Sequence, residues 1–150
     1  MNIVLLDGAS LPSPLARPLE ATEWSEREKT PLDQLVEALA EADVAITNKV
    51  RIDRLALEQL PKLKLICVAA TGYDCVDIAA CRDQGVTVCN VPAYSAVSVA
   101  EHVMCSLFAL RRQLLAYRTA SASEWPASSH FCVHGEPIQD LQGSTLGIIG

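Results

Sequence analysis

Half of the 150 residues are hydrophobic and only 20% are charged, so the chain can bury a core and its composition is that of a globular chain and not of a disordered one. The net charge of −6, with no basic cluster larger than Arg111–Arg112, argues against a nucleic-acid-binding surface. No apolar run approaches the roughly 20 residues of a membrane span, and the N-terminus lacks the pattern of a signal peptide. We therefore expect a cytoplasmic protein with no nucleic-acid or membrane partner.

The first ninety residues alternate between short apolar runs and amphipathic stretches, which predicts strands alternating with helices. Strands are expected at residues 2–6, 44–47, 65–70 and 86–89, with a further edge strand at 21–24. Helices are expected at 31–42, 53–60 and 76–84. Parallel strands need a crossover between them, so the alternation indicates an α/β fold with a parallel sheet.

Local signals indicate where these helices begin and end. Thr30 can cap the helix at 31–42, and Asp74 and Asp77 precede or begin the helix at 76–84, where their side chains can accept from free backbone N–H groups. Pro61 stops the helix at 53–60, and Gly85 is placed to take the left-handed conformation that ends helices.

Polar residues follow three of the expected strands. They are Asn48–Lys49, Thr71–Asp74 and the run Asn90-Val91-Pro92. The carboxyl ends of parallel strands meet at one edge of a sheet, where ligands bind in folds of this class. We therefore expect these three clusters to lie together and to form the candidate site.

A long apolar helix is expected from Ser95 to Arg112, and Ser98–Glu101 fits a capping box near its start. The helix has little polar face, and the apolar pattern continues to Leu114 and Leu115, so we expect it to be buried between two bodies. A core helix of a single domain is the alternative.

Residues 118–140 are expected to form a long loop. Its aromatic residues Trp125 and Phe131 favour an interface with a second copy of the chain, and a loop folded back on its own domain is the alternative. After the loop, Leu146–Ile149 is expected to be a strand, and Gly150 stands where a dinucleotide-binding loop begins.

Six cysteines occur without a C-x-x-C pair, and most lie among Val, Ile and Ala, so we expect reduced thiols in the core. The spacing of His130, Cys132 and His134 invites a metal site, but no fourth ligand is evident. We expect no metal.

Four ordered motifs carry a family resemblance. They are Ala70-Thr71-Gly72-Tyr73-Asp74 with Asp77, the run from Gly85 to Ser95, Ser98 to His102, and Leu141 to Gly150. Together they resemble the D-isomer-specific 2-hydroxyacid dehydrogenases over residues 44–150. The run Asn90 to Ser95 and the pattern Trp125-x-x-Ser128-x-x-Phe131 are most similar to the glycerate dehydrogenase or hydroxypyruvate reductase branch.

The resemblance implies a flavodoxin-like substrate domain at 1–97, a bridging helix and dimerisation loop at 98–140, and the start of a truncated Rossmann domain at 141–150. It implies NAD or NADP as cofactor, contacted here by Val103 and Gly150, and a homodimer joined through residues 118–140. The catalytic Arg, Glu and His are expected downstream of residue 150, so none is assigned in this chain. We expect the 150 residues alone to be inactive.

The implied reaction interconverts a small D-2-hydroxy acid and its 2-keto acid, of the glycerate/hydroxypyruvate or glyoxylate type. The turn Thr71-Gly72-Tyr73 can point successive N–H groups at the substrate carboxylate, and Lys49 can add a positive charge. The plainer alternatives are an ordinary turn glycine and a solvated lysine. A non-catalytic NAD(H)-sensing corepressor-like relative and an inactive substrate-domain fragment are the alternative functions.

Overall fold

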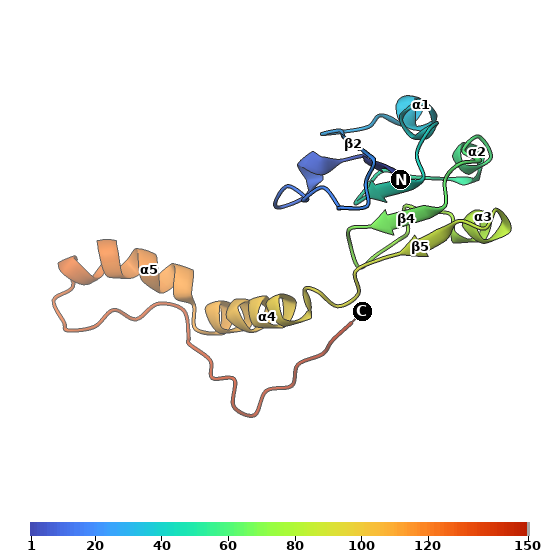
Figure 1. Ribbon diagram of the computed structural model, residues 1–150. Coiled ribbons are helices and arrows are strands. Elements are labelled where there is room, and N and C mark those ends of the chain that lie inside the picture. The colour runs from blue at the N-terminus through green and yellow to red at the C-terminus, as the bar shows by residue number, and fades with distance from the viewer. Residues whose placement is uncertain (150) are drawn as a thin grey trace. The chain divides into compact units, whose positions relative to one another are not determined.

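The computed structural model describes residues 1–149 (Figure 1). The chain divides into two compact units, Met1–Tyr94 and a second unit that begins at Ser95. Each unit has its own secondary structure.

A five-stranded parallel sheet forms the first unit and confirms the predicted α/β fold. Its strands are β1 Asn2–Leu5, β2 Glu23–Glu26, β3 Val44–Thr47, β4 Leu65–Val68 and β5 Thr87–Cys89. They lie in the order β2-β1-β3-β4-β5, which is the flavodoxin-like order. The direction of winding reverses between β1 and β3, so the carboxyl ends of these strands are a favourable place for a ligand.

The edge strand β2 begins two residues later than predicted. The guanidinium of Arg17 donates to the carbonyls of Ala21 and Thr22, at 2.7 and 2.8 Å, and the strand begins after these residues. From Glu23 onward the chain runs beside β1, with Trp24 opposite Ile3.

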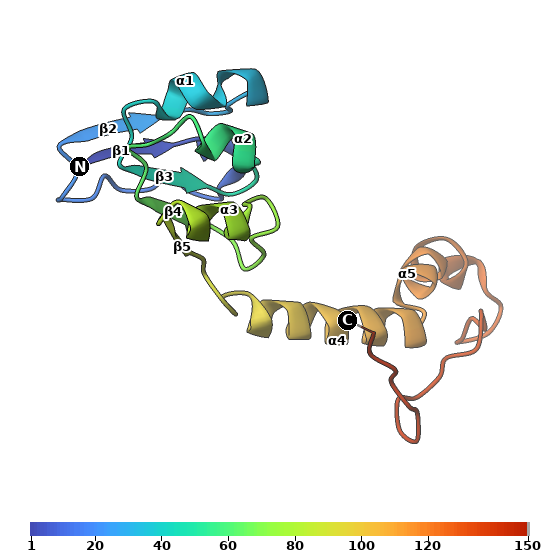
Figure 2. The same ribbon diagram turned by 90° about the vertical axis from the view of Figure 1, so that its right-hand side faces the viewer.

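Three short helices pack on one face of the sheet (Figure 2). They are α1 Leu35–Leu39, which follows the 3-10 turn η2 Leu32–Gln34, then α2 Arg54–Leu57 and α3 Ile78–Asp83. Side chains alternate along each strand, so Ile66 and Val68 of β4 join the core under the helices, while Leu65 and Cys67 pack on the opposite face. All three helices are shorter than predicted.

The helix caps agree with the sequence in part. The Asp77 carboxylate accepts from the Ala80 N–H at 2.9 Å, which confirms its predicted role, and Gly85 has φ +71°. Asp74 caps nothing, because α3 begins after Asp77. The prediction for Thr30 is also wrong: its buried hydroxyl donates to the Leu6 carbonyl at 2.6 Å and so stabilises the chain after β1.

Replacing Asp77 with Ala is expected to lower the free energy of unfolding by about 1 kcal/mol, because one N–H of α3 loses its acceptor. Urea unfolding would measure the change. Asp74→Ala is the matched control, since it removes a carboxylate three residues away that caps no helix. Equal losses in both variants would contradict the assignment of the cap.

The second unit contains helices α4 Ala96–Arg111 and α5 Leu114–Ser123, then the 3-10 turn η3 Trp125–Ala127. The capping box is wrong, because Ser98 lies inside the first turn of α4, which the Val99 N–H closes on the Ser95 carbonyl at 2.9 Å. Gln113 has φ +52°, which breaks the helix and assigns Leu114 and Leu115 to α5.

Part of the predicted loop at 118–140 is therefore helical. The chain has neither proline nor glycine between Leu114 and Glu124, so nothing in that stretch interrupts α5 before Pro126. The strand expected at Leu146–Ile149 is absent from the described residues. A strand needs a hydrogen-bonded neighbour, and none of the five strands pairs with this run. No helix within residues 1–149 is long and apolar enough to cross a membrane.

Candidate functional site

The turn that leaves β4 is fastened to the residues that follow β5. The side-chain amide of Asn90 donates to the Thr71 carbonyl at 2.8 Å, and the Thr71 hydroxyl donates to the Val91 carbonyl at 3.0 Å. The Val91 N–H donates to the Ala70 carbonyl at 3.0 Å. The segments after β4 and β5 thus meet as predicted, and both polar groups of Thr71 are occupied in holding them together.

The backbone N–H groups of the next two residues of this turn are free to bind a ligand. Within residues 1–149, the backbone N–H groups of Gly72 and Tyr73 donate to no protein acceptor. A Cβ added at Gly72 would lie 3.5 Å from Asp74 Oδ2, which is an ordinary contact, so the packing of the protein itself leaves room for a side chain there. Adjacent unpaired N–H groups in a turn can bind a carboxylate.

Lys49 lies beside this turn. A cavity of about 210 Å³ is lined by residues that follow β3 and β4, namely Asn48, Lys49, Gly72, Asp74 and Cys75. Burial raises the pKa of the half-buried Cys75 thiol. The structure therefore brings Lys49 and Gly72 together, although 23 positions separate them in the sequence.

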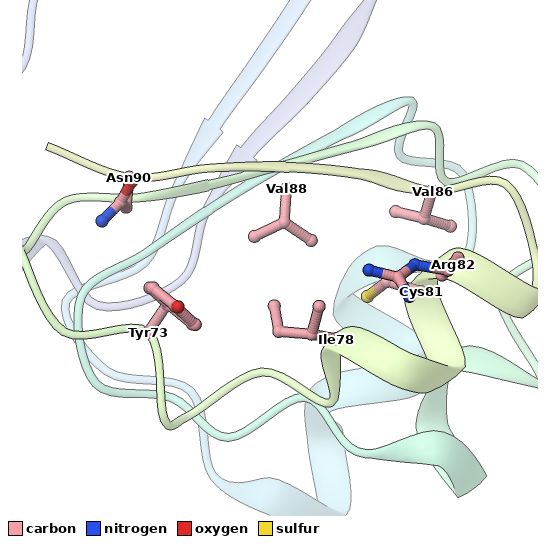
Figure 3. A pocket seen from close by; sticks show the side chains of 7 residues that line it. All are labelled: Tyr73, Ile78, Cys81, Arg82, Val86, Val88 and Asn90. Atoms are coloured by element: carbon pink, nitrogen blue, oxygen red, sulfur yellow. The ribbon is translucent and has the colours of Figure 1, made fainter.

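Tyr73 lines a different cavity of about 350 Å³, next to β5 and α3 (Figure 3). Tyr73 and Asn90 stand at one end of this cavity, Ile78 and Val88 near its middle, and Arg82 toward its other end. The tyrosine side chain is about half exposed. The Tyr73 backbone lies in the turn, but Tyr73 is not among the residues that line the cavity beside Lys49.

Asp7 is a site residue that sequence reasoning missed. Its buried carboxylate accepts from the N–H of Lys49 at 2.7 Å and from the N–H of Asn48 at 2.9 Å. Asp7 follows β1 and the two donors follow β3, so the contact fixes Lys49 at the carboxyl edge of the sheet. The sequence signal for this residue is an aspartate directly after a buried strand.

Positive charge surrounds the ends of β1 and β3. Lys29, Lys49 and Arg51 line a cavity of about 430 Å³ there, together with Asp7. None of these three cations forms an ion pair within residues 1–149. Three cations against the single carboxylate of Asp7 make this lining suitable for an anion, although the chain as a whole carries a net charge of −6.

Residues 3–145 match the family model described as the catalytic domain of the D-isomer specific 2-hydroxyacid dehydrogenases. The chain belongs to this family. A putative 2-hydroxyacid dehydrogenase of Haemophilus influenzae is 42% identical over 100% of the chain and 49% of its own length. A glycerate dehydrogenase of Methylorubrum extorquens is 44% identical over 99% of the chain and 48% of its own length. The chain thus spans about half the length of these relatives.

Two solved structures have a similar fold. An acyclic imino acid reductase in complex with NADPH and D-Arg is 27% identical, with a TM-score of 0.68 over 87% of the chain and 42% of that protein. An NAD-dependent formate dehydrogenase from Staphylococcus aureus in complex with NAD is also 27% identical, with a TM-score of 0.60 over 82% of the chain and 42% of that protein. The similarity to these structures agrees with the predicted flavodoxin-like sheet.

Two residues were assigned to the cofactor. Val103 lies on α4 and is 43% exposed in this chain. Gly150 lies outside the described residues. The apolar run Leu146–Ile149 forms no helix or strand within the described residues, so it does not by itself form a dinucleotide site.

Arg111, at the end of α4, was not recognised as important from sequence. Its guanidinium donates to the Gln139 side chain, to the Asp140 carbonyl at 2.7 Å and to Ser144 Oγ at 2.7 Å. The neighbouring Arg112 forms an exposed ion pair with Asp140 at 2.6 Å. These contacts hold residues 139–144 against α4, at the point where the chain leads toward the expected Rossmann strand.

The segment after α5 is organised around aromatic residues. Trp125 and Phe131 meet edge to face with ring centres 6.1 Å apart, and the Tyr117 hydroxyl accepts from the Gly135 N–H at 3.2 Å. A cavity of about 290 Å³ lies beside them, and Phe131 is 94% exposed in this chain. A large exposed aromatic beside an apolar cavity is typical of an interface.

All six thiols are free within the described chain, but their burial differs from the prediction. Cys81 lies in the core, and Cys67 and Cys75 are half-buried. Cys89, Cys105 and Cys132 are exposed in this chain, so the expectation of core thiols is wrong for them. For Cys89 the reason is that β5 is an edge strand and this side chain lies on the face away from the helices.

Proposed function

We propose that the chain is the N-terminal part of an NAD- or NADP-dependent oxidoreductase that interconverts a small D-2-hydroxy acid and its 2-keto acid. Glycerate/hydroxypyruvate and glyoxylate are the preferred substrate pairs. Relatives support this choice, since they include a glycerate dehydrogenase at 44% identity and a hydroxypyruvate reductase at 29% identity. The observation that carries the proposal is the pair of unpaired N–H groups at Gly72 and Tyr73 beside Lys49.

The turn supplies the carboxylate-binding side of the site. The N–H groups of Gly72 and Tyr73 donate to the substrate carboxylate, and the absent side chain at Gly72 permits its close approach. Lys49 adds a positive charge, at a position fixed by the contact between Asp7 and the Lys49 backbone. Thr71 acts through its hydroxyl and carbonyl, which hold the turn against the residues after β5. The ring of Tyr73 lines the neighbouring cavity.

The remaining parts of the enzyme follow the family layout. Residues 1–97 form the substrate domain, 98–140 the bridging helix and dimerisation loop, and 141–150 the start of the nucleotide-binding domain. When bound, the nicotinamide supplies the hydride, and Val103 and Gly150 belong to the surface that holds the cofactor. An Arg, a Glu and a His from that domain complete the chemistry, so the 150 residues alone are inactive. The enzyme works in the cytoplasm.

NADH and NADPH consumption with hydroxypyruvate and with glyoxylate tests this proposal. The intact enzyme, carrying residues 1–150 and the nucleotide-binding domain, is expected to turn over, and the 150-residue chain is expected to show none. Turnover by the 150 residues alone would overturn the claim that the catalytic groups lie downstream. An intact enzyme that reduces neither keto acid would contradict the substrate assignment.

The dimer proposed for residues 118–140 depends on its aromatic residues. Trp125→Ala in the intact enzyme removes the edge-to-face partner of Phe131 and part of the wall of the adjoining cavity. We expect the dimer dissociation constant to rise about 10-fold or more, since large aromatic residues dominate interface energies. Sedimentation velocity over a concentration series measures it. Leu19→Ala is the control, because Leu19 is fully exposed in the first unit. If the Trp125→Ala and Leu19→Ala dimers had the same dissociation constant, residues 118–140 would not form the interface.

A further inference from the structure

Two cysteines lie side by side on the sheet. Cys67 of β4 is in direct register with Cys89 of β5. Their strand neighbours Ile66 and Val88 pack into the core under the helices, so the alternation of side chains puts both thiols on the opposite face. The three α-helices of residues 1–94 all pack on the other face (Figure 2). The two thiols are outside the substrate turn described above.

Their separation is close to that of a disulfide. Neighbouring strands lie about 4.8 Å apart, and disulfides join Cα atoms about 4.4–6.8 Å apart. The Cβ atoms of in-register parallel residues must approach by about half an ångström to reach the usual range of roughly 3.5–4.5 Å. β5 can make this shift because it is an edge strand, which within residues 1–149 is bonded to β4 alone.

The thiols also differ in a way that suits stepwise oxidation. Cys89 is exposed and reachable by a small oxidant, whereas Cys67 is half-buried. Burial raises the pKa of the Cys67 thiol, and the nearby Cys89 raises it further. The shifted pKa values of Cys75 and Cys81 have no thiol among their causes. The exposed Cys89 is therefore the thiol that reacts first.

We propose that Cys67 and Cys89 are a redox-active pair that peroxides oxidise to a disulfide. The Cys89 thiolate attacks one oxygen of hydrogen peroxide, the O–O bond breaks, and sulfenic acid and water form once the leaving hydroxide takes up a proton. The Cys67 sulfur then attacks the Cys89 sulfur, the S–O bond breaks, and a second water leaves with the Cys67 proton. In total, two thiols lose two electrons and one peroxide becomes two waters.

The disulfide would fix the edge strand next to the substrate turn. Cys89 immediately precedes Asn90, whose side chain holds the Thr71 carbonyl. A disulfide between Cys67 and Cys89 would join β4, which leads into the Thr71 turn, to β5, which leads to Asn90. Oxidation of the two thiols does not depend on whether the turn binds a keto acid.

Peptide mapping of the intact chain after treatment with hydrogen peroxide tests the pair. Trypsin alone leaves Cys67, Cys75 and Cys81 in one peptide, because it cuts after Lys64 and Arg82; a second cut before Asp74 by an Asp-specific protease isolates Cys67. We expect a mass loss of about 2 Da for the oxidised chain and a cross-link between the peptide 65–73 and the peptide that contains Cys89. Reduction with dithiothreitol should restore the original mass and remove the cross-link.

A control is needed for Cys105, because it lies in the same tryptic peptide as Cys89. Cys105→Ser is expected to keep the cross-link and Cys89→Ser to lose it; both replaced side chains are exposed in this chain, so both variants should fold. Phenylarsine oxide, which bridges neighbouring thiols without an oxidant, should protect Cys67 and Cys89 together from alkylation. A cross-link that survives Cys89→Ser, or two thiols that remain freely alkylated after peroxide and after the arsenical, would overturn the proposal.

Discussion

Gly72→Val in the intact enzyme is expected to raise the KM for hydroxypyruvate about 10- to 100-fold, because hydrogen bonds to a charged group contribute about 1.5–3 kcal/mol and each 1.4 kcal/mol is tenfold. The valine side chain would occupy the space in which the carboxylate approaches the N–H groups of Gly72 and Tyr73. The packing around the turn would tolerate it, since a Cβ at Gly72 lies 3.5 Å from its nearest neighbour, Asp74 Oδ2. Steady-state kinetics with hydroxypyruvate and NADH or NADPH measure the effect.

Two controls separate this effect from general damage to the fold. Ala79→Val adds two carbons at an exposed position of the neighbouring helix α3 and should leave the KM unchanged. Thermal unfolding should show that Gly72→Val stays within a few degrees of the unmodified protein, as expected for a surface substitution. An unchanged KM in a folded Gly72→Val enzyme would remove the turn from the substrate site.

Arg111→Met is expected to cost about 2–3 kcal/mol of the stability of the second unit, because one charged guanidinium loses three acceptors at once. Residues 139–144 would lose most of their attachment to α4. Urea unfolding gives the free energy, and hydrogen exchange of the amides at 139–144 reports the local release. The Gln139 N–H, which donates to the Arg111 carbonyl at 3.0 Å, should lose protection.

Arg112→Met is the matched comparison at the adjacent position. Its guanidinium forms one exposed ion pair with Asp140, and pairs of this kind contribute about 0–1 kcal/mol. A larger loss of unfolding free energy for Arg111→Met than for Arg112→Met would show that Arg111 holds residues 139–144 against α4. Equal and small losses in both variants would mean that residues 139–144 are held by other contacts.

Local patterns in the sequence predicted the sheet and the general place of the site. Apolar runs alternate with amphipathic stretches, and that alternation is sufficient to indicate a parallel sheet whose strands end at one edge. The meeting of the Thr71 turn with Asn90 and Val91 followed from this rule alone. Asp77 and Gly85 could be assigned because a cap and a left-handed helix end depend on neighbouring residues only.

Contacts between distant residues could not be predicted in the same way. Asp7 binds the backbone of Lys49 because β1 lies next to β3, and the order of strands is not a local property. The Thr30 hydroxyl was predicted to cap a helix but is buried against Leu6, which follows β1. Arg111 was seen only as half of a basic pair, since its acceptors lie 28 to 33 positions away.

Two further differences between prediction and structure lie in the second unit. Gln113 takes φ +52°, which few non-glycine residues adopt, and it separates α4 from the second helix α5, which extends into the expected loop. The apolar run Leu146–Ile149 has the composition of a strand, but a strand forms only beside a partner.

The central claim is that the N–H groups of the Thr71-Gly72-Tyr73 turn bind the carboxylate of a 2-keto acid. The most direct test is the amide signal of Gly72 in the intact enzyme labelled with 15N-glycine and assigned with Gly72→Ala. Hydroxypyruvate should be added with the oxidised cofactor, so that no turnover occurs, and hydroxyacetone, which lacks the carboxylate, serves as the matched control. We predict that the Gly72 proton moves downfield with hydroxypyruvate and stays in place with hydroxyacetone. A Gly72 signal that does not move at concentrations of hydroxypyruvate that saturate turnover would contradict the claim.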